Sequence, residues 1–257
     1  MNYIGIDIGS TCAKTVVLNE KKEIIQEFVQ PTGWSSVDTA EEILQKLKLA
    51  GINLSDDPSC CVATGYGRIS VPYADKTVTE ITCHALGAVH LFQQSDLTVI
   101  DIGGQDTKII QIEQGFVKDF IMNDKCAAGT GRFLEVMANT LSLRPNEMFE
   151  LARLGSDTTI SSMCTVFAES EVIGLIGKGE PKENIAYAVV DSTIRKVAAQ
   201  VSRMNGEMST FCLTGGLCEC EYIREALSKK LGKEVISSPD ARYAGAIGAA
   251  LSAMKIR

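Results

Sequence analysis

The chain has 257 residues, of which 45% are apolar and 22% charged, and a formal net charge of −7. This composition is typical of a folded globular protein, long enough for one large domain or two smaller ones. The negative charge argues against a nucleic-acid partner, because sequence-independent binding needs many Lys and Arg side chains. No stretch approaches the ~20 apolar residues of a membrane-spanning helix. The N-terminus enters a strand without a basic segment, so we expect no signal peptide, no membrane partner and a cytoplasmic location.

The chain contains nine cysteines. A disulfide framework is not expected from an odd number of cysteines in the reducing cytosol. Most should therefore be small buried hydrophobic residues, and a minority should carry metal or redox chemistry.

Hydrophobic patterning predicts an α/β chain in which one arrangement occurs twice. The first part predicts strands over 3–8, 14–18 and 23–29, a helix over 40–49, a strand over 58–63 and a helix over 80–92. The second part predicts strands over 97–102, 107–112 and 116–122, then helices, one strand over 210–213 and a closing helix over 243–254. Two strand–turn–strand–strand units about 95 residues apart indicate an internal duplication.

Each unit has an aspartate at the end of an apolar strand, then a turn of small residues, then a lysine. Such turns suit phosphate, because glycine lets backbone N–H groups approach its oxygens. The predicted phosphate contacts are Gly9, Ser10, Thr11, Cys12 and Lys14 in the first loop and Gly103, Gly104 and Gln105 in the second. Asp7 and Asp101 are suited to hold Mg²⁺ through its water shell and, with Gln105, are the catalytic candidates. A plain hairpin turn explains either loop alone, but two equivalent loops favour the phosphate site.

The paired loops resemble the two phosphate motifs of the actin/Hsp70/hexokinase superfamily. Thr214-Gly215-Gly216 is similar to its adenosine motif, and Gly215 and Gly216 become nucleotide-binding candidates. Glu80 sits where the superfamily often has a glutamate that orients Mg²⁺-bound water, although an ordinary first-turn glutamate explains it equally well. The resemblance implies two ribonuclease H-like lobes with a nucleotide cleft between them. Residues 1–94, completed by 243–257, would form the first lobe, and residues 95–242 the second.

Two cysteines lie next to predicted helix starts. Cys126 precedes a turn containing Gly129 and Gly131, and Cys164 precedes an apolar helix. A thiol near a helix N-terminus is biased toward thiolate, the form that ligates iron or zinc. Two thiolates complete neither a tetrahedral zinc site nor a [4Fe–4S] cluster, which needs four cysteines. A two-fold dimer that contributes two from each subunit is one solution, and inert cysteines are the other.

The segments Asn-Asp-Lys-Cys-Ala-Ala-Gly-Thr-Gly-Arg-Phe-Leu-Glu and Ser-Met-Cys-Thr-Val-Phe-Ala-Glu-Ser-Glu are similar to signature segments of the activators of 2-hydroxyacyl-CoA dehydratases, in the BadF/BadG/BcrA/BcrD-type ATPase family. The similarity runs from Tyr3 to about Ala250. It implies a homodimer with one [4Fe–4S] cluster held by Cys126 and Cys164 of each subunit.

The same resemblance implies an ATPase coupled to electron transfer in anaerobic metabolism. It would bind ATP/ADP and Mg²⁺, with Gly129 and Gly131 near the ribose. Ferredoxin or flavodoxin would donate the electron, and an iron–sulfur enzyme, a dehydratase or a reductase component, would accept it.

Two alternatives remain open from the residues. A small-molecule kinase of the same superfamily would use an aspartate such as Asp106 as its base, and an actin-like scaffold would use the same fold. The C-x-C pair Cys218 and Cys220 could hold a metal, whereas His84 needs no special role on its helix. The loop over 64–68 has no assigned role.

Overall fold

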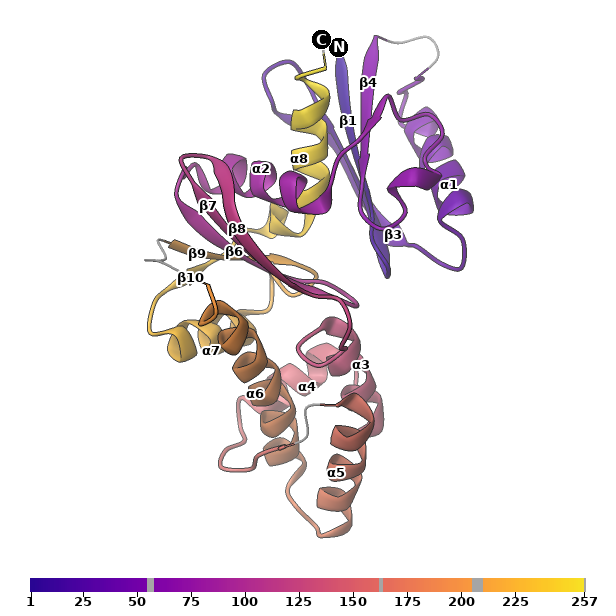
Figure 1. Cartoon of the computed structure of the whole chain (residues 1–257). Coiled ribbons are helices and arrows are strands. Elements are labelled where there is room, and N and C mark those ends of the chain that lie inside the picture. Colours follow the sequence, from indigo (N-terminus) through magenta and orange to yellow (C-terminus); the bar gives the residue numbers. More distant parts are fainter. Residues whose placement is uncertain (55–57, 162–163, 205–209, 257) are drawn as a thin grey trace. The chain divides into compact units, whose positions relative to one another are not determined.

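The computed structural model describes residues 1–54, 58–161, 164–204 and 210–256 (Figure 1). The chain divides into two compact units. The first unit comprises residues 1–99, 112–118 and 240–257, and the second comprises residues 100–111 and 119–239. Ser162 and Met163, within the second cysteine segment, lie outside the described residues.

The first sheet has the strand order β3-β2-β1-β4-β5. Its antiparallel part is β1 (Asn2–Ile8), β2 (Cys12–Leu18) and β3 (Ile24–Pro31), and β4 (Ser59–Thr64) and β5 (Lys76–Thr77) extend it in parallel. The helices of this unit are α1 (Ser36–Leu49), α2 (Glu80–Phe92) and α8 (Ala244–Ala253), with 3₁₀ turns η1 (Arg68–Ser70) and η2 (Pro239–Tyr243) at its connections.

Side chains alternate between the two faces of the first sheet, and each face is covered by helices. Ile4 and Ile6 of β1 pack with Ile43 of α1 on one face. Val16 and Leu18 of β2 pack against α8 on the other. The central strands are therefore buried almost throughout, as in sheets with helices on both sides.

Close helix packing holds α8 in the first unit. A Cβ on Gly5 of β1 would overlap the Ala246 carbonyl of α8. A Cβ on Gly87 of α2 would overlap the Ala244 carbonyl, and one on Gly248 would overlap the Cys83 carbonyl. The small-residue sequence of α8 thus lets it lie directly on β1 and α2, although most of the chain separates these elements.

The second sheet, in the order β10-β9-β6-β7-β8, has the same plan as the first. Its strands are β6 (Leu97–Ile102), β7 (Thr107–Glu113), β8 (Phe116–Asn123), β9 (Thr210–Gly215) and β10 (Val235–Ile236). The helices of the second unit are α3 (Gly131–Thr140), α4 (Pro145–Ala152), α5 (Thr165–Gly177), α6 (Lys182–Val201) and α7 (Glu221–Leu231). The repeated strand order agrees with the duplication that the sequence indicates.

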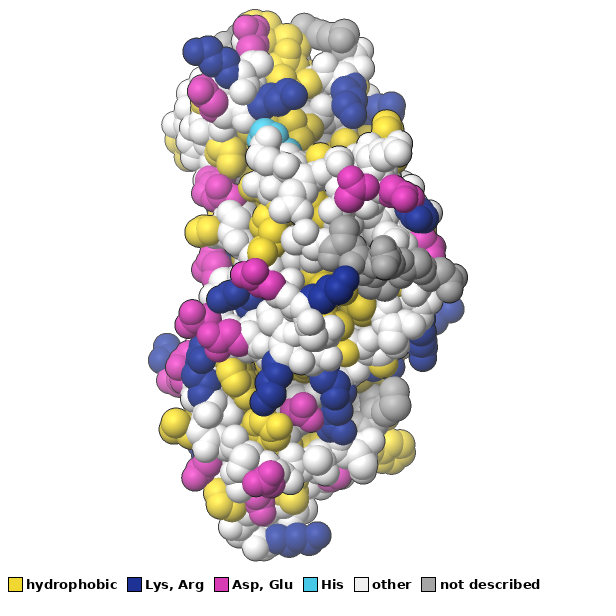
Figure 2. Space-filling view, turned by 90° about the vertical axis from the view of Figure 1, so that its left-hand side faces the viewer, with side chains coloured by type: hydrophobic (Ala, Val, Ile, Leu, Met, Phe, Trp, Pro, Cys, Tyr) yellow, Lys and Arg dark blue, Asp and Glu magenta, His cyan; other side chains and the backbone are white. Residues whose placement is uncertain are grey.

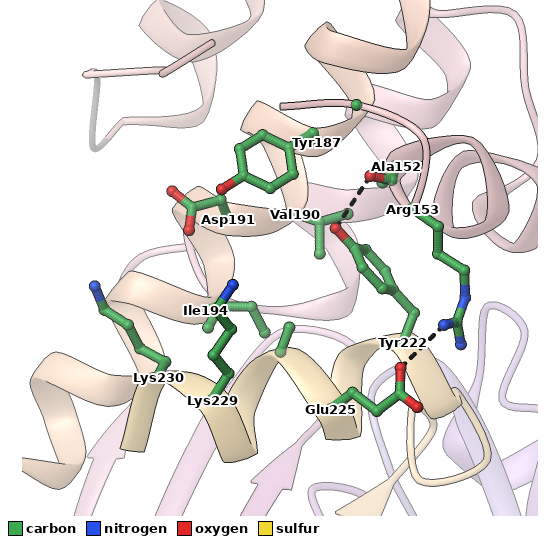
Figure 3. A pocket seen from close by; sticks show the side chains of 12 residues that line it. Ala152, Arg153, Tyr187, Val190, Asp191, Ile194, Tyr222, Glu225, Lys229 and Lys230 are labelled. Carbon is green, nitrogen blue, oxygen red and sulfur yellow. Dashed lines mark hydrogen bonds and ion pairs between the residues drawn. The ribbon is translucent and has the colours of Figure 1, made fainter. Parts of the chain in front are cut away.

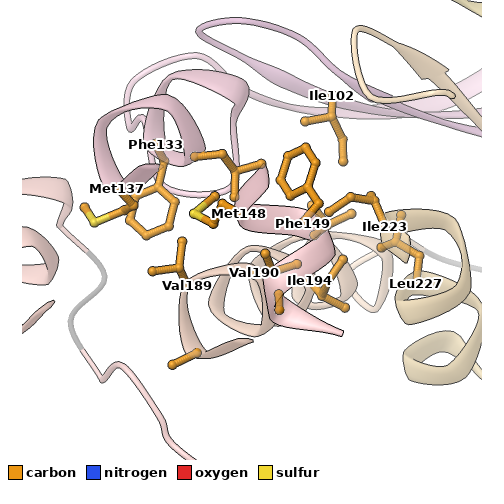
Figure 4. Close-up of a cluster of buried hydrophobic side chains, with 14 of the residues drawn as sticks. Ile102, Phe133, Met137, Met148, Phe149, Val189, Val190, Ile194, Ile223 and Leu227 are labelled. Carbon is orange, nitrogen blue, oxygen red and sulfur yellow. The ribbon is translucent and has the colours of Figure 1, made fainter. Parts of the chain in front are cut away.

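The core of the second unit is formed where its helices meet the sheet (Figure 4). Phe133 of α3, Phe149 of α4 and Val190 of α6 point into this cluster, together with Ile102 of β6. The same core fixes the end of β6, which leads into the second predicted phosphate loop.

The predicted strands and long helices lie where the sequence places them, with two differences. The helix predicted over 40–49 begins at Ser36, because the Ser35 side chain caps it by accepting a hydrogen bond from Asp38 N at 3.2 Å. The strands β5 and β10 were not predicted, since two residues are too few to set up an alternating pattern.

The surface carries charges of both signs. On the face shown in Figure 2, Lys and Arg side chains are interspersed with Asp and Glu rather than gathered by sign. In the part of the chain that the structure describes, no helix is both long and apolar enough to cross a membrane.

Gly248→Ala should destabilise the protein, because its Cβ would force α8 away from α2. Overpacking of this kind costs about 1–3 kcal/mol, which lowers the midpoint of thermal unfolding by roughly 2–12 °C in a chain of this size. Gly174→Ala on α5 is the matched control, because nothing lies within 4 Å of its Cβ position. Equal midpoints for the two variants would contradict the close α2–α8 contact.

Candidate functional site

The two predicted phosphate loops are the same turn in two places. In the β1–β2 turn, Gly9 N donates to Cys12 O at 3.1 Å, and in the β6–β7 turn Gly103 N donates to Asp106 O at 2.9 Å. The predicted loop residues reach the surface: Thr11 and Gln105 are exposed, and Gly9, Ser10, Cys12, Lys14, Gly103 and Gly104 are partly exposed. Both turns therefore present accessible backbone groups, and the first adds the hydroxyl groups of Ser10 and Thr11.

The lysines that follow the two loops differ. Lys108 is buried, and its Nζ lies 2.7 Å from Asp106 Oδ2 and 3.4 Å from Asp101 Oδ2. Lys14, at the equivalent place, is partly exposed. Lys108 therefore neutralises two buried carboxylates, and Lys14 is the loop lysine with access to a ligand.

Asp101 is held from both sides of its carboxylate. Besides the Lys108 ammonium, Thr214 Oγ1 donates to Asp101 Oδ1 at 2.8 Å. A Cβ on Gly215 would lie 2.9 Å from the same oxygen, and the positive φ of +85° favours glycine there. The predicted adenosine motif is thus packed on the aspartate of the second loop.

Asp7 is the counterpart of Asp101 in the first unit, and its environment is different. Asp7 is buried, and among the described residues its Oδ1 has no hydrogen-bond partner. Cβ atoms on Gly65 and Gly245 would each lie 2.6 Å from an oxygen of this carboxylate. A buried carboxylate oxygen that lacks a partner is costly, and the glycines leave room beside it, so Asp7 fits a hydrated cation such as Mg²⁺.

The loop over 64–68 acquires a structural role. Thr64-Gly65 ends β4 as Thr214-Gly215 ends β9, and Gly65 has a φ of +87° against the +85° of Gly215. Gly67 N also donates to Ile8 O at 2.9 Å. The two units therefore bring equivalent Thr-Gly turns against equivalent aspartates, which the spacing of the repeat could have suggested.

His84, to which the sequence pattern assigns no role, lies at the first aspartate. A Cβ on Gly245 would be 2.9 Å from His84 Nε2 and 2.6 Å from Asp7 Oδ2, so the imidazole and the carboxylate converge on one point of α8. Glu80 lies one turn before His84 at the start of α2. The spacing of Glu80 and His84, four residues apart on one helix face, was the available signal.

The second phosphate loop is hydrogen-bonded to the segment that follows Cys126. Gly131 N donates to Gly103 O at 2.9 Å, and Arg132 N donates to Gly104 O at 2.8 Å. Thr107 Oγ1 donates to the buried Gly129 carbonyl at 2.6 Å. The start of α3 is thus fixed directly on the loop.

The cysteines fall into two groups by burial. Cys126 is partly exposed, and Cys164 is exposed at the N-cap position of α5. Burial raises the pKa of the Cys83 thiol to about 12, and burial also raises the pKa values of Cys61 and Cys212. Cys12 and Cys220 are also partly exposed, and Cys220 is the N-cap residue of α7, where burial raises the pKa of its thiol. Cys164 is the most accessible of these thiols, and Cys126 lies just before the turn that leads into α3.

The C-x-C pair is less suited to metal. Cys218 is buried, and burial raises the pKa of the Cys220 thiol. Within the described ranges, no three His, Cys, Asp or Glu side chains are grouped as metal ligands. Any centre with four thiolates at Cys126 and Cys164 would need a second chain.

A cavity of about 570 Å³ lies between α4, α6 and α7 (Figure 3). Its walls include Tyr187, Asp191, Tyr222, Lys229 and Lys230. Tyr222 OH donates to the Ala152 carbonyl at 3.2 Å, and Arg153 is ion-paired with Glu225 at 2.9 Å. None of the predicted site residues lines this cavity, which no sequence pattern indicated.

A sequence profile of the BadF/BadG/BcrA/BcrD ATPase family matches residues 4–253. The chain belongs to this family. It is 43% identical over 254 residues to the (R)-2-hydroxyglutaryl-CoA dehydratase activating ATPase of Acidaminococcus fermentans, covering 98% of this chain and 96% of that protein. The predicted family is thereby confirmed.

Solved structures agree with this assignment. The Acidaminococcus fermentans (R)-2-hydroxyglutaryl-CoA dehydratase component A has a TM-score of 0.92 and 42% identity, with 100% of this chain and 98% of that chain covered. The activator of 2-hydroxyisocaproyl-CoA dehydratase from Clostridium difficile, with bound ADPNP, has a TM-score of 0.90 and 34% identity, with 100% and 95% covered.

A more distant structure bears on the fold alone. A ROK family glucokinase from Streptomyces griseus has a TM-score of 0.62 and 17% identity, with 99% of this chain and 100% of that chain covered. The predicted two-lobed α/β fold of the actin/Hsp70/hexokinase kind is confirmed. The lobe boundaries and the residue roles stay predictions.

Lys108→Met should destabilise the ATPase-family fold strongly, because it leaves two buried carboxylates without their cation. Removing one partner of a buried ion pair costs about 3–5 kcal/mol, measurable by urea unfolding at pH 7. Lys118→Met is the matched control, since its ion pair with Glu113 is exposed and exposed pairs contribute about 0–1 kcal/mol. Similar losses of unfolding free energy in both variants would show that the buried Lys108 ion pairs stabilise the fold no more than an exposed pair does.

Thiol alkylation should separate the two groups of cysteines. In metal-free protein at pH 8, iodoacetamide should modify exposed Cys164 and partly exposed Cys126 before the buried thiols, as read by mass spectrometry. Cys83 should react far more slowly, because a thiol of pKa about 12 is thiolate in roughly one molecule in ten thousand at pH 8. In denaturant all nine cysteines should react. Native labelling of Cys83 as fast as Cys164 would refute the distinction.

Proposed function

We propose that this protein hydrolyses ATP to drive a low-potential electron into an acceptor enzyme of the 2-hydroxyacyl-CoA dehydratase kind or a related reductase. Its family membership supports the ATPase activity, and its relatives named as dehydratase-activating proteins support the acceptor. The observation that carries the proposal is the direct bonding of the second phosphate loop to the segment after Cys126. These hydrogen bonds connect the loop that is predicted to bind phosphate with the segment that carries Cys126, a thiol suited to ligate iron.

In this proposal both phosphate loops contribute to ATP binding. Lys14 provides the accessible cation for phosphate, and exposed Gln105 is placed to orient water. Asp7, whose Oδ1 has no hydrogen-bond partner among the described residues, would hold Mg²⁺ through water, and Asp101 is bonded to Thr214, next to the Gly215 turn. Glu80 is the remaining catalytic candidate. It lies on α2 one turn before His84, and His84 lies beside Asp7. Gly216 and the Gly129–Gly131 turn are assigned to the nucleoside.

Cys126 and Cys164 are assigned as ligands of one [4Fe–4S] cluster shared by a homodimer. When bound, such a cluster supplies reversible one-electron storage at low potential. The fit rests on two accessible thiols in a chain whose other cysteines are largely buried. Each subunit contributes two of the four thiolates, so the cluster requires the dimer.

The exposed face of α5 supports a dimer next to Cys164. This helix buries only Ala168 and Val172, although it is apolar on most sides. Its exposed apolar side chains are Val166, Phe167, Ile173 and Ile176. A helix that is apolar all round is normally buried, and a second copy of the same helix would cover this one.

Coupling follows from the bonds at the second loop. A shift of Gly103 and Gly104 on ATP hydrolysis moves the Gly131 and Arg132 N–H groups, and with them the start of α3. Asn123 Nδ2 donates to the Cys126 carbonyl at 2.8 Å, which fixes that residue to the end of β8. The nucleotide state therefore reaches the backbone at Cys126. A ferredoxin or flavodoxin is the proposed electron donor, in a cytoplasmic and anaerobic setting.

A kinase is the weaker alternative. Asp106, the base that a kinase would use, is buried against the Lys108 ammonium at 2.7 Å. A base must be aimed at the substrate hydroxyl to accept its proton, whereas this carboxylate is already committed to a buried cation.

The decisive experiment is iron and acid-labile sulfide analysis after anaerobic purification. We expect about four of each per dimer, lost in both Cys126→Ser and Cys164→Ser. Cys220→Ser is the matched control and should retain them. Asp7→Asn should retain iron but lose most ATP hydrolysis, because the carboxylate assigned to Mg²⁺ is gone. An iron-free parent protein whose ATP hydrolysis ignores both cysteine variants would end the electron-transfer proposal.

A further inference from the structure

Four apolar side chains of the first unit are exposed and have no part in its core. Trp34 is 100% exposed, Ile69 84%, Val37 58% and Tyr66 50%. Scattered exposed apolar residues are ordinary, but large aromatic side chains in water are enriched at protein–protein contacts. We call these four residues the Trp34 patch.

The patch is one region, because its two segments are packed together. Trp34 and Val37 flank the start of α1, whereas Tyr66 and Ile69 belong to the connection after β4. A Cβ on Gly67 would lie 2.8 Å from Ser36 Oγ. Farther along, Tyr73 OH donates to the Ala40 carbonyl of α1 at 2.6 Å.

Both segments are hydrogen-bonded to the first phosphate loop. Thr32, two residues before Trp34, donates from N to Thr11 O at 2.9 Å and from Oγ1 to Gly9 O at 2.7 Å. On the other side, Gly67 N donates to Ile8 O at 2.9 Å. A change in the loop on ATP binding or hydrolysis is therefore transmitted to both halves of the patch.

The size of the patch indicates the kind of partner. Large aromatic side chains bury about 150–250 Å² each, so fully exposed Trp34 and half-exposed Tyr66, with the two smaller aliphatic side chains, expose together on the order of 500 Å². A stable interface needs about 800 Å² per partner, whereas transient redox complexes bury less than about 600 Å² per partner. The area is thus too small for a permanent dimer contact and suits a partner that binds and leaves in each cycle.

We propose that the Trp34 patch is a nucleotide-responsive docking surface for the acceptor enzyme. This inference rests on the proposed function, which requires an acceptor that is released after each electron. Because one segment of the patch is hydrogen-bonded to the first phosphate loop and the other to Ile8, which precedes that loop, the nucleotide state alters affinity for the acceptor. By linkage, the bound acceptor alters nucleotide affinity by the same factor.

The test uses purified (R)-2-hydroxyglutaryl-CoA dehydratase as the probe, since the 43% identical relative is its activating ATPase. That relative is the positive control for binding. Dissociation constants are measured anaerobically for the dimeric protein with ADP and with a non-hydrolysable ATP analogue. Trp34→Ala and Ile69→Ala should weaken binding at least tenfold, as for central interface residues. The difference between the two nucleotides should shrink in both variants.

Leu49→Ala is the matched control, because Leu49 is 88% exposed at the opposite end of α1. It should change the dissociation constant less than twofold. All three variants should retain iron content, ATP hydrolysis and the dimer, since none of these side chains supports the core.

Three results would overturn the docking surface. They are equal binding by Trp34→Ala and Leu49→Ala, loss of the dimer in Trp34→Ala, and no binding by the parent protein while the relative binds. Failure of the proposed function is distinguishable, because it appears as missing iron in the parent protein regardless of binding.

Discussion

A buried aspartate at the end of the first strand organises each unit of this protein. In the second unit, Asp101 is satisfied by Thr214 and Lys108, so that its loop is fixed by the protein itself. In the first unit, Asp7 keeps one oxygen without a partner among the described residues. Burying a carboxylate is costly unless it is paired. The difference leaves the Asp7 carboxylate open to a ligand, whereas the Asp101 carboxylate is already paired within the protein.

Glycines that lie against the two carboxylates leave the space that these buried aspartates occupy. Gly65 and Gly245 lie against Asp7, and Gly215 lies against Asp101, at distances that a Cβ would reduce below van der Waals contact. The absence of a Cβ at other glycines likewise lets α8 lie directly on β1 and α2. Hydrophobic burial stabilises both sheets, whereas the close backbone contacts determine where the polar groups lie. A substitution in α8 should therefore disturb the Asp7 site as well as stability.

Each loop is also the origin of a mechanical connection. The second loop is bonded to the start of α3, next to Cys126, and the first is bonded to Thr32 and Gly67 beneath an exposed apolar surface. Family membership places this architecture among ATPases, and three relatives of the chain are named for activating dehydratases.

The sequence by itself determined the repeated loops, the two-lobed fold and the family, because these depend on local patterns and on long motifs around Cys126 and Cys164. It did not determine the burial of Lys108, the approach of His84 to Asp7 or the role of Gly65. Each of these depends on partners that folding brings together from distant parts of the chain. Lys14 and Lys108 occupy equivalent positions in similar motifs, yet only the tertiary structure pairs Lys108 with two carboxylates. Local sequence fixes which groups are present, but packing decides which of them are already satisfied.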